Sequence, residues 1–376
     1  MVSPTKRHST KKYETRGASF HSFPPFSCAP SGQQIVIQVT GVLLINLGTP
    51  AAPSTGAVRR YLREFLSDPR VIDIAAPLRW LLLNAIILPI RPRKSAAAYR
   101  KVWRGDGAEG SPLLHFSRLQ AAALQRALPQ HKVVLAMRYG EPSLPQGLAE
   151  LTDAGVDEIV VVPLYPQYAS ASTGSSLAKL FALAGEKVVV PRLRVVPDFF
   201  DETGFITAFA AVASPLLNSF KPDHVLLSYH GLPERQVRAS DATGQYCLAS
   251  SDCCDRIGSA NAHCYRAQCF ATSRALTARL GLSRVSTSFQ SRLGRTPWIK
   301  PYSDVVLKEL ATSGVKKLAV LCPSFVADCL ETLEEVAMRG AHDFKAAGGQ
   351  ELLLVPSLND HPRWIEALAH MVSRAP

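Results

Sequence analysis

The sequence has no apolar run as long as a membrane-spanning helix, which needs about 18 residues or more. The longest run, WLLLNAIILPI from Trp80 to Ile90, is interrupted by Asn84 and Pro89. We therefore expect a protein that is soluble or that touches a membrane only at its surface. The chain also lacks the apolar core of a secretory signal, and it has no GxSxG motif, which disfavours a serine hydrolase.

Acidic residues are scarce relative to basic ones, with 30 Asp and Glu against 42 Lys and Arg and a formal net charge of +12. Such a charge favours acidic partners, which include nucleic acid, anionic lipid and carboxylate-bearing substrates, and it does not choose among them. Residues 1–37 are basic, rich in Ser, Thr and Pro, and without apolar periodicity. They are predicted to be a disordered tail, and an organelle transit peptide, a plain tail and a misassigned start codon stay open.

Short apolar runs alternate with helical patterns along the rest of the 376 residues. The runs are VLLINL near 42–47, KVVLAM near 132–137, EIVVVPL near 158–164, KVVVPRL near 187–193, HVLLSY near 224–229, RVSTSF near 284–289, KLAVLC near 317–322 and ELLLVP near 351–356. This alternation predicts an α/β protein with parallel sheets, and the length suits two domains. We predict two similar halves, residues 38–195 and 196–376, with helices that include 55–67 and 361–373.

Two stretches repeat one frame: GVLLINLGTP from Gly41 to Pro50 and HVLLSYHGLPER from His224 to Arg235. Each predicts a buried strand, then a Gly- and Pro-containing loop, then a helix. Ligands of open parallel sheets bind beyond the carboxyl ends of the strands, which is where His230 falls. His230 is therefore a candidate catalytic residue, and a hydrogen-bonded structural histidine is the alternative.

A second candidate group lies in CPSFVADCLETLEEV, where a strand ends and a helix is expected from about Asp328. Glu331 and Glu335 are four residues apart, so they share a helical face. We expect Glu334 to lie on a solvated face. Glu331, near the strand end, is the better candidate for a buried carboxylate.

These stretches belong to a longer series in which the chain resembles a known family. The series comprises LINLGTP, YLREFLSDPRVID, GSPL, AMRYGEP, PLYPQYASASTGSS, SYHGLPER, FQSRLGRTPW and CPSFVADCLETLEE. In this order it resembles the ferrochelatases, lyases of haem biosynthesis that insert ferrous iron into a porphyrin. The resemblance implies two flavodoxin-like halves facing a porphyrin cleft, with ferrous iron and protoporphyrin IX as substrates and no nucleic acid partner.

The resemblance also implies roles for single residues. The invariant histidine and glutamate of the family fall on His230 and Glu331, which would bind the substrate iron or accept the two pyrrole protons, and which residue does which stays open. Glu335 would extend the proton or metal path, with Asp328 a weaker candidate. The porphyrin ring would contact Leu47, Tyr165, Tyr168 and Trp298, its propionates Arg91, Tyr99 and Ser111, and Arg138 would line the pocket. Core packing and a solvated basic face are the alternatives for these aromatic and basic residues.

The stretch between Tyr99 and Ser111 is longer than the family spacing, which leaves the alignment of Arg91 open. It contains a formal GxGxxG at 105–110, but no strand precedes it, so a dinucleotide site is rejected. By resemblance, residues 77–94 form the lip of the cleft. Their apolar run beside basic residues suits an anionic membrane surface, and a buried helix is the alternative. We expect a cytoplasmic protein, with contact at the inner membrane left open.

Five of the eight cysteines fall in one predicted insertion, residues 241–269. Disulfides are disfavoured without a secretory signal, and the spacing matches neither a zinc ribbon nor the plant ferredoxin pattern well. Some microbial ferrochelatases carry a 2Fe–2S cluster on such an insertion, and the resemblance implies that Cys247, Cys254, Cys264 and Cys269 are its ligands, with Cys253 as a substitute. Such a cluster is expected to brace the insertion or to sense iron and oxidant. Zinc and free redox-active thiols stay open.

Three other functions stay open as well. They are a chelatase for coproporphyrin, a cobalt chelatase for a different tetrapyrrole, and a non-catalytic porphyrin or haem carrier. The FQSRLGRTPW and DCLETLEE stretches favour the protoporphyrin enzyme over the cobalt type.

Overall fold

The computed structural model describes residues 40–105, 110–294 and 296–376. Within them the chain forms two four-stranded sheets in which every pairing is parallel. This confirms the predicted α/β class. The predictions for the tail, residues 1–37, lie outside the described residues and stay predictions.

The two sheets have the same strand order. The first contains β1 (Gly41–Gly48), β2 (Lys132–Tyr139), β3 (Glu158–Pro163) and β4 (Arg192–Val195) in the order β2-β1-β3-β4. The second contains β5 (His224–His230), β6 (Val285–Gln290), β7 (Lys317–Leu321) and β8 (Glu351–Leu354) in the order β6-β5-β7-β8. The two stretches with the repeated frame therefore form equivalent inner strands, β1 and β5. The carboxyl end of each is where ligands are expected.

Helices follow the strands in both halves, and three segments are π-helices. The first half contains α1 (Thr55–Ser67), α2 (Ala76–Leu81), the π-helix η1 (Leu82–Ile87), α3 (Leu88–Val102), α4 (Pro112–Ala127), α5 (Leu144–Asp153), the π-helix η2 (Ser170–Gly174) and α6 (Ser175–Gly185). The second contains α7 (Thr203–Phe220), α8 (Glu234–Ala239), α9 (Tyr265–Leu280), α10 (Ser303–Thr312), the π-helix η3 (Glu331–Gly340), α11 (Ala341–Ala346) and α12 (Pro362–Ser373). The helix predicted over 55–67 is confirmed, and the terminal helix begins one residue later than expected.

Strand β1 is buried along its whole length except at Leu47. A continuous apolar strand is what a parallel sheet covered on both faces requires. Gly48 ends the strand with φ at +113°, and a Cβ there would lie 1.8 Å from the carbonyl oxygen of Tyr139 on β2. Only glycine permits this approach, so Gly48 fixes where the first sheet opens.

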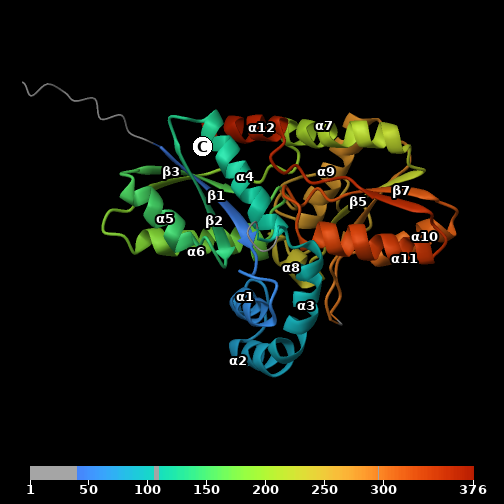
Figure 1. Ribbon diagram of the computed structural model, residues 1–376, viewed down its shortest axis with the longest axis horizontal. Helices are drawn as coiled ribbons and strands as arrows, with labels where there is room; N and C mark the ends of the chain where they lie inside the picture. The colour runs from blue at the N-terminus through green and yellow to red at the C-terminus, as the bar shows by residue number, and fades with distance from the viewer. Residues whose placement is uncertain (1–39, 106–109, 295) are drawn as a thin grey trace, which may run out of the picture. The chain divides into compact units, whose positions relative to one another are not determined.

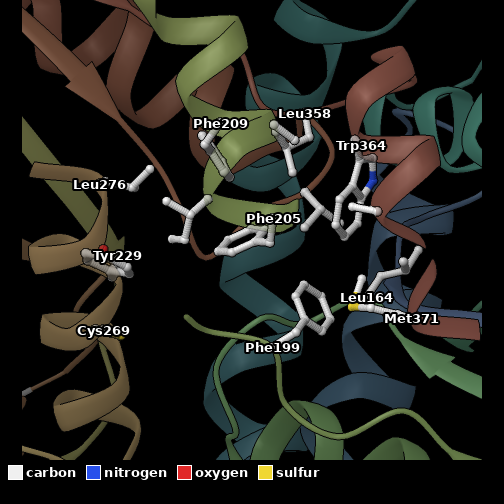
Figure 2. Packing of buried hydrophobic residues seen from close by; sticks show 14 of the residues in the cluster. Leu164, Phe199, Phe205, Phe209, Tyr229, Cys269, Leu276, Leu358, Trp364 and Met371 are labelled. Carbon is white, nitrogen blue, oxygen red and sulfur yellow. The ribbon is translucent and has the colours of Figure 1, made fainter. Parts of the chain in front are cut away.

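One apolar core joins the two halves. It contains residues from both sheets, among them Leu44 of β1 and Leu227 of β5. The C-terminal helix α12 packs against α4 of the first half and α7 of the second (Figure 1). Figure 2 shows Phe199, Phe205 and Trp364 turned toward one another in this core, with ring centroids 5.4 to 6.1 Å apart. The division at residues 195 and 196 follows the end of β4, and it stays a prediction.

Helix α7 is the one helix in the described ranges whose length and composition would suit a membrane span. Its Phe205 and Phe209 are buried in the shared core, and the helix packs against α9 and α12. These contacts give α7 a core position within the fold, as apolar helices of compact domains often have.

The prediction of a strand over 187–193 is wrong. β4 is confined to Arg192–Val195, and the three preceding valines, Val188, Val189 and Val190, are exposed by 103%, 76% and 59%. The reason is the register: Arg192 pairs with Glu158, the first residue of β3. Upstream of that pair β3 offers no neighbour, so the valine run has no strand to pair with despite its high β-propensity.

Candidate active site

His230 is the last residue of β5, and three hydrogen bonds hold it. Its amide donates to Ser324 Oγ over 3.2 Å, and its carbonyl accepts from the Tyr265 hydroxyl over 2.8 Å. Its ring Nδ1 lies 2.7 Å from the carbonyl oxygen of Gly231. A carbonyl oxygen can only accept, so Nδ1 carries the hydrogen and the lone pair of the neutral ring is on Nε2. Nε2 is therefore the nitrogen that can bind a metal or take a proton.

Two aromatic rings flank the imidazole. The ring centroids of Trp298 and Phe325 lie 6.5 and 6.4 Å from that of His230. The indole is held in turn by its Nε1, which donates to the Leu293 carbonyl over 2.9 Å. A Cβ at Gly231 would lie 2.9 Å from the Gln290 carbonyl oxygen and 3.2 Å from the Trp298 ring. The glycine thus lets the indole and β6 close around the histidine.

Gln290 and Ser291 connect the end of β5 with the backbone of Glu331 and the carboxylate of Glu335. Gln290 is the register partner of His230 across β5 and β6, and its side-chain amide reaches the carbonyl oxygen of Glu331 at 3.5 Å, the long limit for a hydrogen bond. The Ser291 amide and hydroxyl both donate to the Glu335 carboxylate, over 2.9 and 2.6 Å. The candidates on η3 therefore lie at the same end of the second sheet as His230. Gln290 and Ser291, both in the FQSRLGRTPW stretch, were missed by the sequence analysis.

The helix expected from about Asp328 instead begins as the π-helix η3 at Glu331. Asp328 is kept in the preceding loop because its carboxylate accepts from Thr332 Oγ, the Ser357 amide and the Asn359 side chain. These bonds make Asp328 a structural anchor. π-helices are rare and concentrate at functional sites, which agrees with the position of η3.

Glu334 is not on a solvated face, so that prediction is wrong. Its exposure is 8%, and its carboxylate is 3.1 Å from Lys101 Nζ and 3.3 Å from Arg339 Nη2. Because a buried carboxylate needs compensating charge, the side chain turns toward these two cations. The pair with Lys101 ties α3 of the first half to η3.

Tyr61 of α1 and Tyr99 of α3 bring neutral phenols close to Glu331. Burial raises the pKa of both hydroxyls, and the nearby Glu331 charge raises each pKa further. Both hydroxyls therefore stay protonated, and that of Tyr61 donates to the Gly48 carbonyl over 3.1 Å. Tyr61 was not a predicted site residue, and its position on the buried face of α1 is the signal that could have suggested it.

Among the predicted propionate and pocket residues, Arg138 is already paired. Its Nη2 lies 2.6 Å from Asp68 Oδ2, and its Nε donates to Ser175 Oγ over 2.7 Å. Burial by itself would raise the pKa of Asp68, but hydrogen bonds from Ser175, the Arg70 amide and Tyr139 outweigh it and lower the pKa. Asp68, in the SDPRVID stretch, was missed as the acceptor that fixes Arg138.

Ser111 and Arg91 occupy different settings. Ser111 is buried as the N-cap of α4, where its Oγ accepts from the Leu114 amide over 3.2 Å. Its hydroxyl hydrogen remains available to an acceptor. Arg91 lies on α3, where burial lowers its pKa and the charge of Glu335 opposes that shift. Arg91 is thus close enough to η3 for its charge to act on Glu335.

The predicted ring contacts of the first half lie near the carboxyl ends of two strands: Leu47 at the end of β1, and Tyr165 and Tyr168 after β3. Leu47 is the one residue of β1 that is not fully buried. The Tyr165 hydroxyl lies 3.3 Å from Ser176 Oγ, and burial raises its pKa. The Tyr168 amide donates to Gln268 Oε1 over 2.6 Å. The centroid of the Tyr168 ring lies 5.8 Å from that of the His263 ring. Tyr168 therefore contacts the second half directly.

Two hollows in the described surface lie away from the candidate site. One of about 520 Å³ lies between α4 and α12, and another of about 660 Å³ lies between α7 and the end of α9. Neither is lined by a predicted site residue. The candidate site is identified instead by the contacts around His230.

The five cysteines of the insertion are all buried and none is in a disulfide. The Sγ atoms of the adjacent Cys253 and Cys254 lie 3.7 Å apart, so both turn inward, contrary to the premise that made Cys253 a substitute. The pKa of the Cys247 thiol is raised, because burial outweighs the opposing effect of a hydrogen bond with Cys264. Arg266 Nη1 lies 3.1 Å from Cys254 Sγ. Close, free thiols are the donor type of a thiolate-bound centre. Burial raises the pKa of Cys253, however, and a hydrogen bond with Cys264 together with burial raises that of Cys254.

The arrangement of these thiols stops short of a complete ligand set. Within residues 40–105, 110–294 and 296–376, no three His, Cys, Asp or Glu side chains are placed to hold a metal ion. Cys269 is on α9, where its thiol hydrogen-bonds with Tyr265 and is near enough to Cys254 for the two to interact electrostatically. The geometry therefore does not select four ligands from the five cysteines.

Comparisons with known proteins place nearly the whole described chain within one family. The ferrochelatase family model matches residues 39–375. The chain is 45% identical over 338 residues to a ferrochelatase of Coxiella burnetii, covering 89% of this chain and 93% of that protein. It is 47% identical over 338 residues to one of Stutzerimonas stutzeri, covering 89% and 98%. A solved structure, SirB from Bacillus subtilis with Fe³⁺, has 15% identity and a TM-score of 0.49, covers 71% of this chain and 92% of that one, and adds nothing to the argument. On the family match and these identities, the chain belongs to the ferrochelatase family.

Proposed function

We propose that the protein inserts ferrous iron into protoporphyrin IX, with release of two protons, as the last step of haem biosynthesis. The observation that carries this proposal is His230 at the end of β5, with Nδ1 committed to the Gly231 carbonyl and Nε2 left as the acceptor. The family placement supports iron and a porphyrin as the substrates.

The reaction requires groups that accept two pyrrole protons and bind iron as it sheds water. An imidazole Nε2 and a carboxylate can each serve as a proton acceptor or as a ligand to ferrous iron. Glu335 is held by two hydrogen bonds from Ser291, and Arg339 lies 3.8 Å away. Glu331 lies near enough to Tyr61 and Tyr99 for its charge to raise the pKa of both hydroxyls, and it makes no hydrogen bond with Ser291 among those that hold Glu335. We therefore assign the reacting carboxylate to Glu331 and the supporting role to Glu335.

The porphyrin would lie against Leu47, Tyr165, Tyr168 and Trp298, whose apolar faces suit a flat ring. Its propionates would reach Arg91 and Tyr99, which are two helical turns apart on α3, together with Ser111. Arg138 would line the pocket without binding a propionate directly, because its guanidinium is already paired with Asp68 and Ser175.

Iron insertion is favoured over the alternatives for a specific reason. A carrier would need the ring contacts, but it would not need a basic nitrogen and carboxylates at one strand end. Here His230, Glu331 and Glu335 share that end. The curated relatives from Coxiella and Stutzerimonas are ferrochelatases. Protoporphyrin is preferred to coproporphyrin because of the FQSRLGRTPW stretch and the apolar lip.

The lip, residues 77–94, is proposed to contact an anionic membrane surface from the cytoplasmic side. Leu83 and Leu88 are buried against α1, while Trp80 and Ile90 are exposed by 67% and 70%. Arg93 and Lys94 lie exposed beside them. Exposed apolar side chains next to cations suit the boundary between lipid headgroups and acyl chains.

We also propose that the insertion, residues 241–269, holds a 2Fe–2S cluster. The proposed ligands are Cys247, Cys254, Cys264 and Cys269, with Cys253 as the substitute. What supports the proposal is the burial and proximity of free thiols, together with the Arg266 contact at Cys254. Zinc and free thiols are the outcomes that would replace it.

Replacing His230 by Ala is expected to lower iron insertion by at least about 100-fold, since a positioned acid–base group contributes that much or more. Protoporphyrin binding should persist, because the imidazole adds little to burial of the ring. Anaerobic assays of haem absorbance and quenching of porphyrin fluorescence measure the two. His224→Ala, at the other end of β5, is the control that should keep turnover. Turnover retained in His230→Ala at saturating iron would refute the assignment.

Glu331→Gln is expected to reduce kcat at least as strongly as Glu335→Gln, because Glu331 is not held by the Ser291 hydrogen bonds. The same anaerobic assay compares both with Glu351→Gln, an exposed glutamate at the start of β8 that should behave as wild type. Loss of activity only in Glu335→Gln would reverse the two roles.

Protein purified without oxygen is expected to be red-brown, with charge-transfer absorption that disappears on dithionite reduction or in Cys264→Ser. The proposed ligand set predicts that Cys269→Ser also loses the absorption and that Cys253→Ser keeps it. The opposite result for this pair would exchange the two ligands. Colourless protein with stoichiometric zinc and no acid-labile sulfide would exclude the cluster.

The double substitution Trp80→Ser and Ile90→Ser is expected to weaken binding to anionic vesicles by about 10-fold or more, because each side chain gives up burial of apolar area. Co-sedimentation with anionic and with neutral vesicles measures the effect. Val189→Ser, which removes an exposed valine elsewhere, is the matched control. Equal binding by wild type and the double variant would exclude the lip as the contact.

A further inference from the structure

We propose that Tyr265, near the C-terminal end of the cysteine-rich insertion, is a positioning residue through which the insertion holds His230. The proposal rests on the function proposed above, because it concerns how His230 is held for that reaction. It gives the insertion a mechanical route to the site through one hydrogen bond.

The contact itself is direct. Tyr265 is the first residue of α9, its side chain is buried, and its hydroxyl donates to the His230 carbonyl over 2.8 Å. The His230 amide donates to Ser324 Oγ. The backbone of His230 is thus held by Ser324, in the loop after β7, and by Tyr265 of α9.

The insertion determines where α9 begins. Cys264 is the N-cap residue of α9, and its amide donates to the Asn261 carbonyl over 2.9 Å. Asn261 Nδ2 donates in turn to the Cys253 carbonyl over 2.9 Å. A change in how the thiols are arranged therefore shifts Cys264, and Tyr265 is the next residue along the chain.

Other residues of the same first turn touch the site. The Gln268 side-chain oxygen accepts from the Tyr168 amide over 2.6 Å, and Arg266 Nε donates to the Lys300 carbonyl over 3.3 Å, two residues after Trp298. Arg266 also reaches Cys254 Sγ. The start of α9 thus contacts Cys254 earlier in the insertion. It also contacts three segments of the site, at Tyr168, His230 and Lys300.

Loss of the Tyr265 hydroxyl should act on turnover and leave substrate binding unchanged. The Tyr265 hydroxyl bonds to the His230 carbonyl and not to a residue assigned to the porphyrin ring. A displacement of about 1 Å at a reacting group can cost up to about 100-fold in rate. A purely structural role would instead lower the amount of folded protein, with normal turnover in the folded fraction.

The first test compares Tyr265→Phe with Tyr246→Phe, the same change at an exposed tyrosine within the insertion. Rates are expressed per porphyrin-binding site, counted by fluorescence titration. Tyr265→Phe is expected to lower kcat by about 10-fold with KM for porphyrin within about 2-fold of wild type. Tyr246→Phe should match wild type. A kcat per binding site within about 2-fold of wild type in Tyr265→Phe would overturn the proposal.

The second test asks whether the insertion acts through Tyr265. Cys247, which hydrogen-bonds with Cys264 next to Tyr265, is replaced by Ser. This change is combined with Tyr265→Phe in a double-mutant cycle, with melting temperature measured alongside kcat. Cys247→Ser is expected to lower kcat several-fold alone and to add less than about 2-fold in the Tyr265→Phe background. Additive losses, or no loss from Cys247→Ser alone, would overturn the coupling. A wild-type protein that inserts no iron would refute the proposed function itself, and this inference with it.

Discussion

The hydrogen bond from His230 Nδ1 to the Gly231 carbonyl, 2.7 Å long, is the interaction on which the account of the site depends. It decides which ring nitrogen is the acceptor, and it joins the ring to the carbonyl of the first residue after β5. Gly231 lets the chain pass close to β6 and Trp298, where a Cβ would meet the Gln290 carbonyl oxygen at 2.9 Å. A side chain at this position would displace either the strand or the indole. The chemistry proposed for His230 is therefore set by backbone geometry at a strand end.

The rest of the site is assembled from both halves around that point. Glu331 and Glu335 are on η3 at the same end of the second sheet, and Tyr61 of α1 and Tyr99 of α3 lie near enough to Glu331 to interact with it electrostatically. Lys101 and Glu334 bridge α3 to η3, and Arg235 of α8 pairs with Asp73 of the first half. The shared core beneath α4, α7 and α12 holds the two sheets in one body. The helices of the first half thus supply the tyrosine hydroxyls near Glu331, and the second half supplies the groups that we propose accept protons or bind metal.

Much of this could be predicted from the sequence because the signals are local. Apolar runs between turns identify the inner strands, and the parallel order then places His230 at a strand end. The failures occur where a distant partner decides the outcome. The valines at 188–190 have strand propensity but no neighbour on β3, and Glu334 is buried because Lys101 approaches from another helix. η3 begins at Glu331 because Asp328 is bound by Ser357 and Asn359, about thirty residues later. The inward turn of both Cys253 and Cys254 depends likewise on the fold of the whole insertion.

The central claim is that His230 presents Nε2 as its acceptor, and nitrogen-15 NMR of the histidine side chains tests it most directly. Spectra of protein labelled at the histidine ring nitrogens should be recorded at a pH at which the ring is neutral. The His230→Ala variant assigns the His230 resonances. The account predicts that Nδ1 of His230 is the protonated nitrogen and that Nε2 has the shift of an unprotonated one. A proton found on Nε2, with Nδ1 unprotonated, would contradict it.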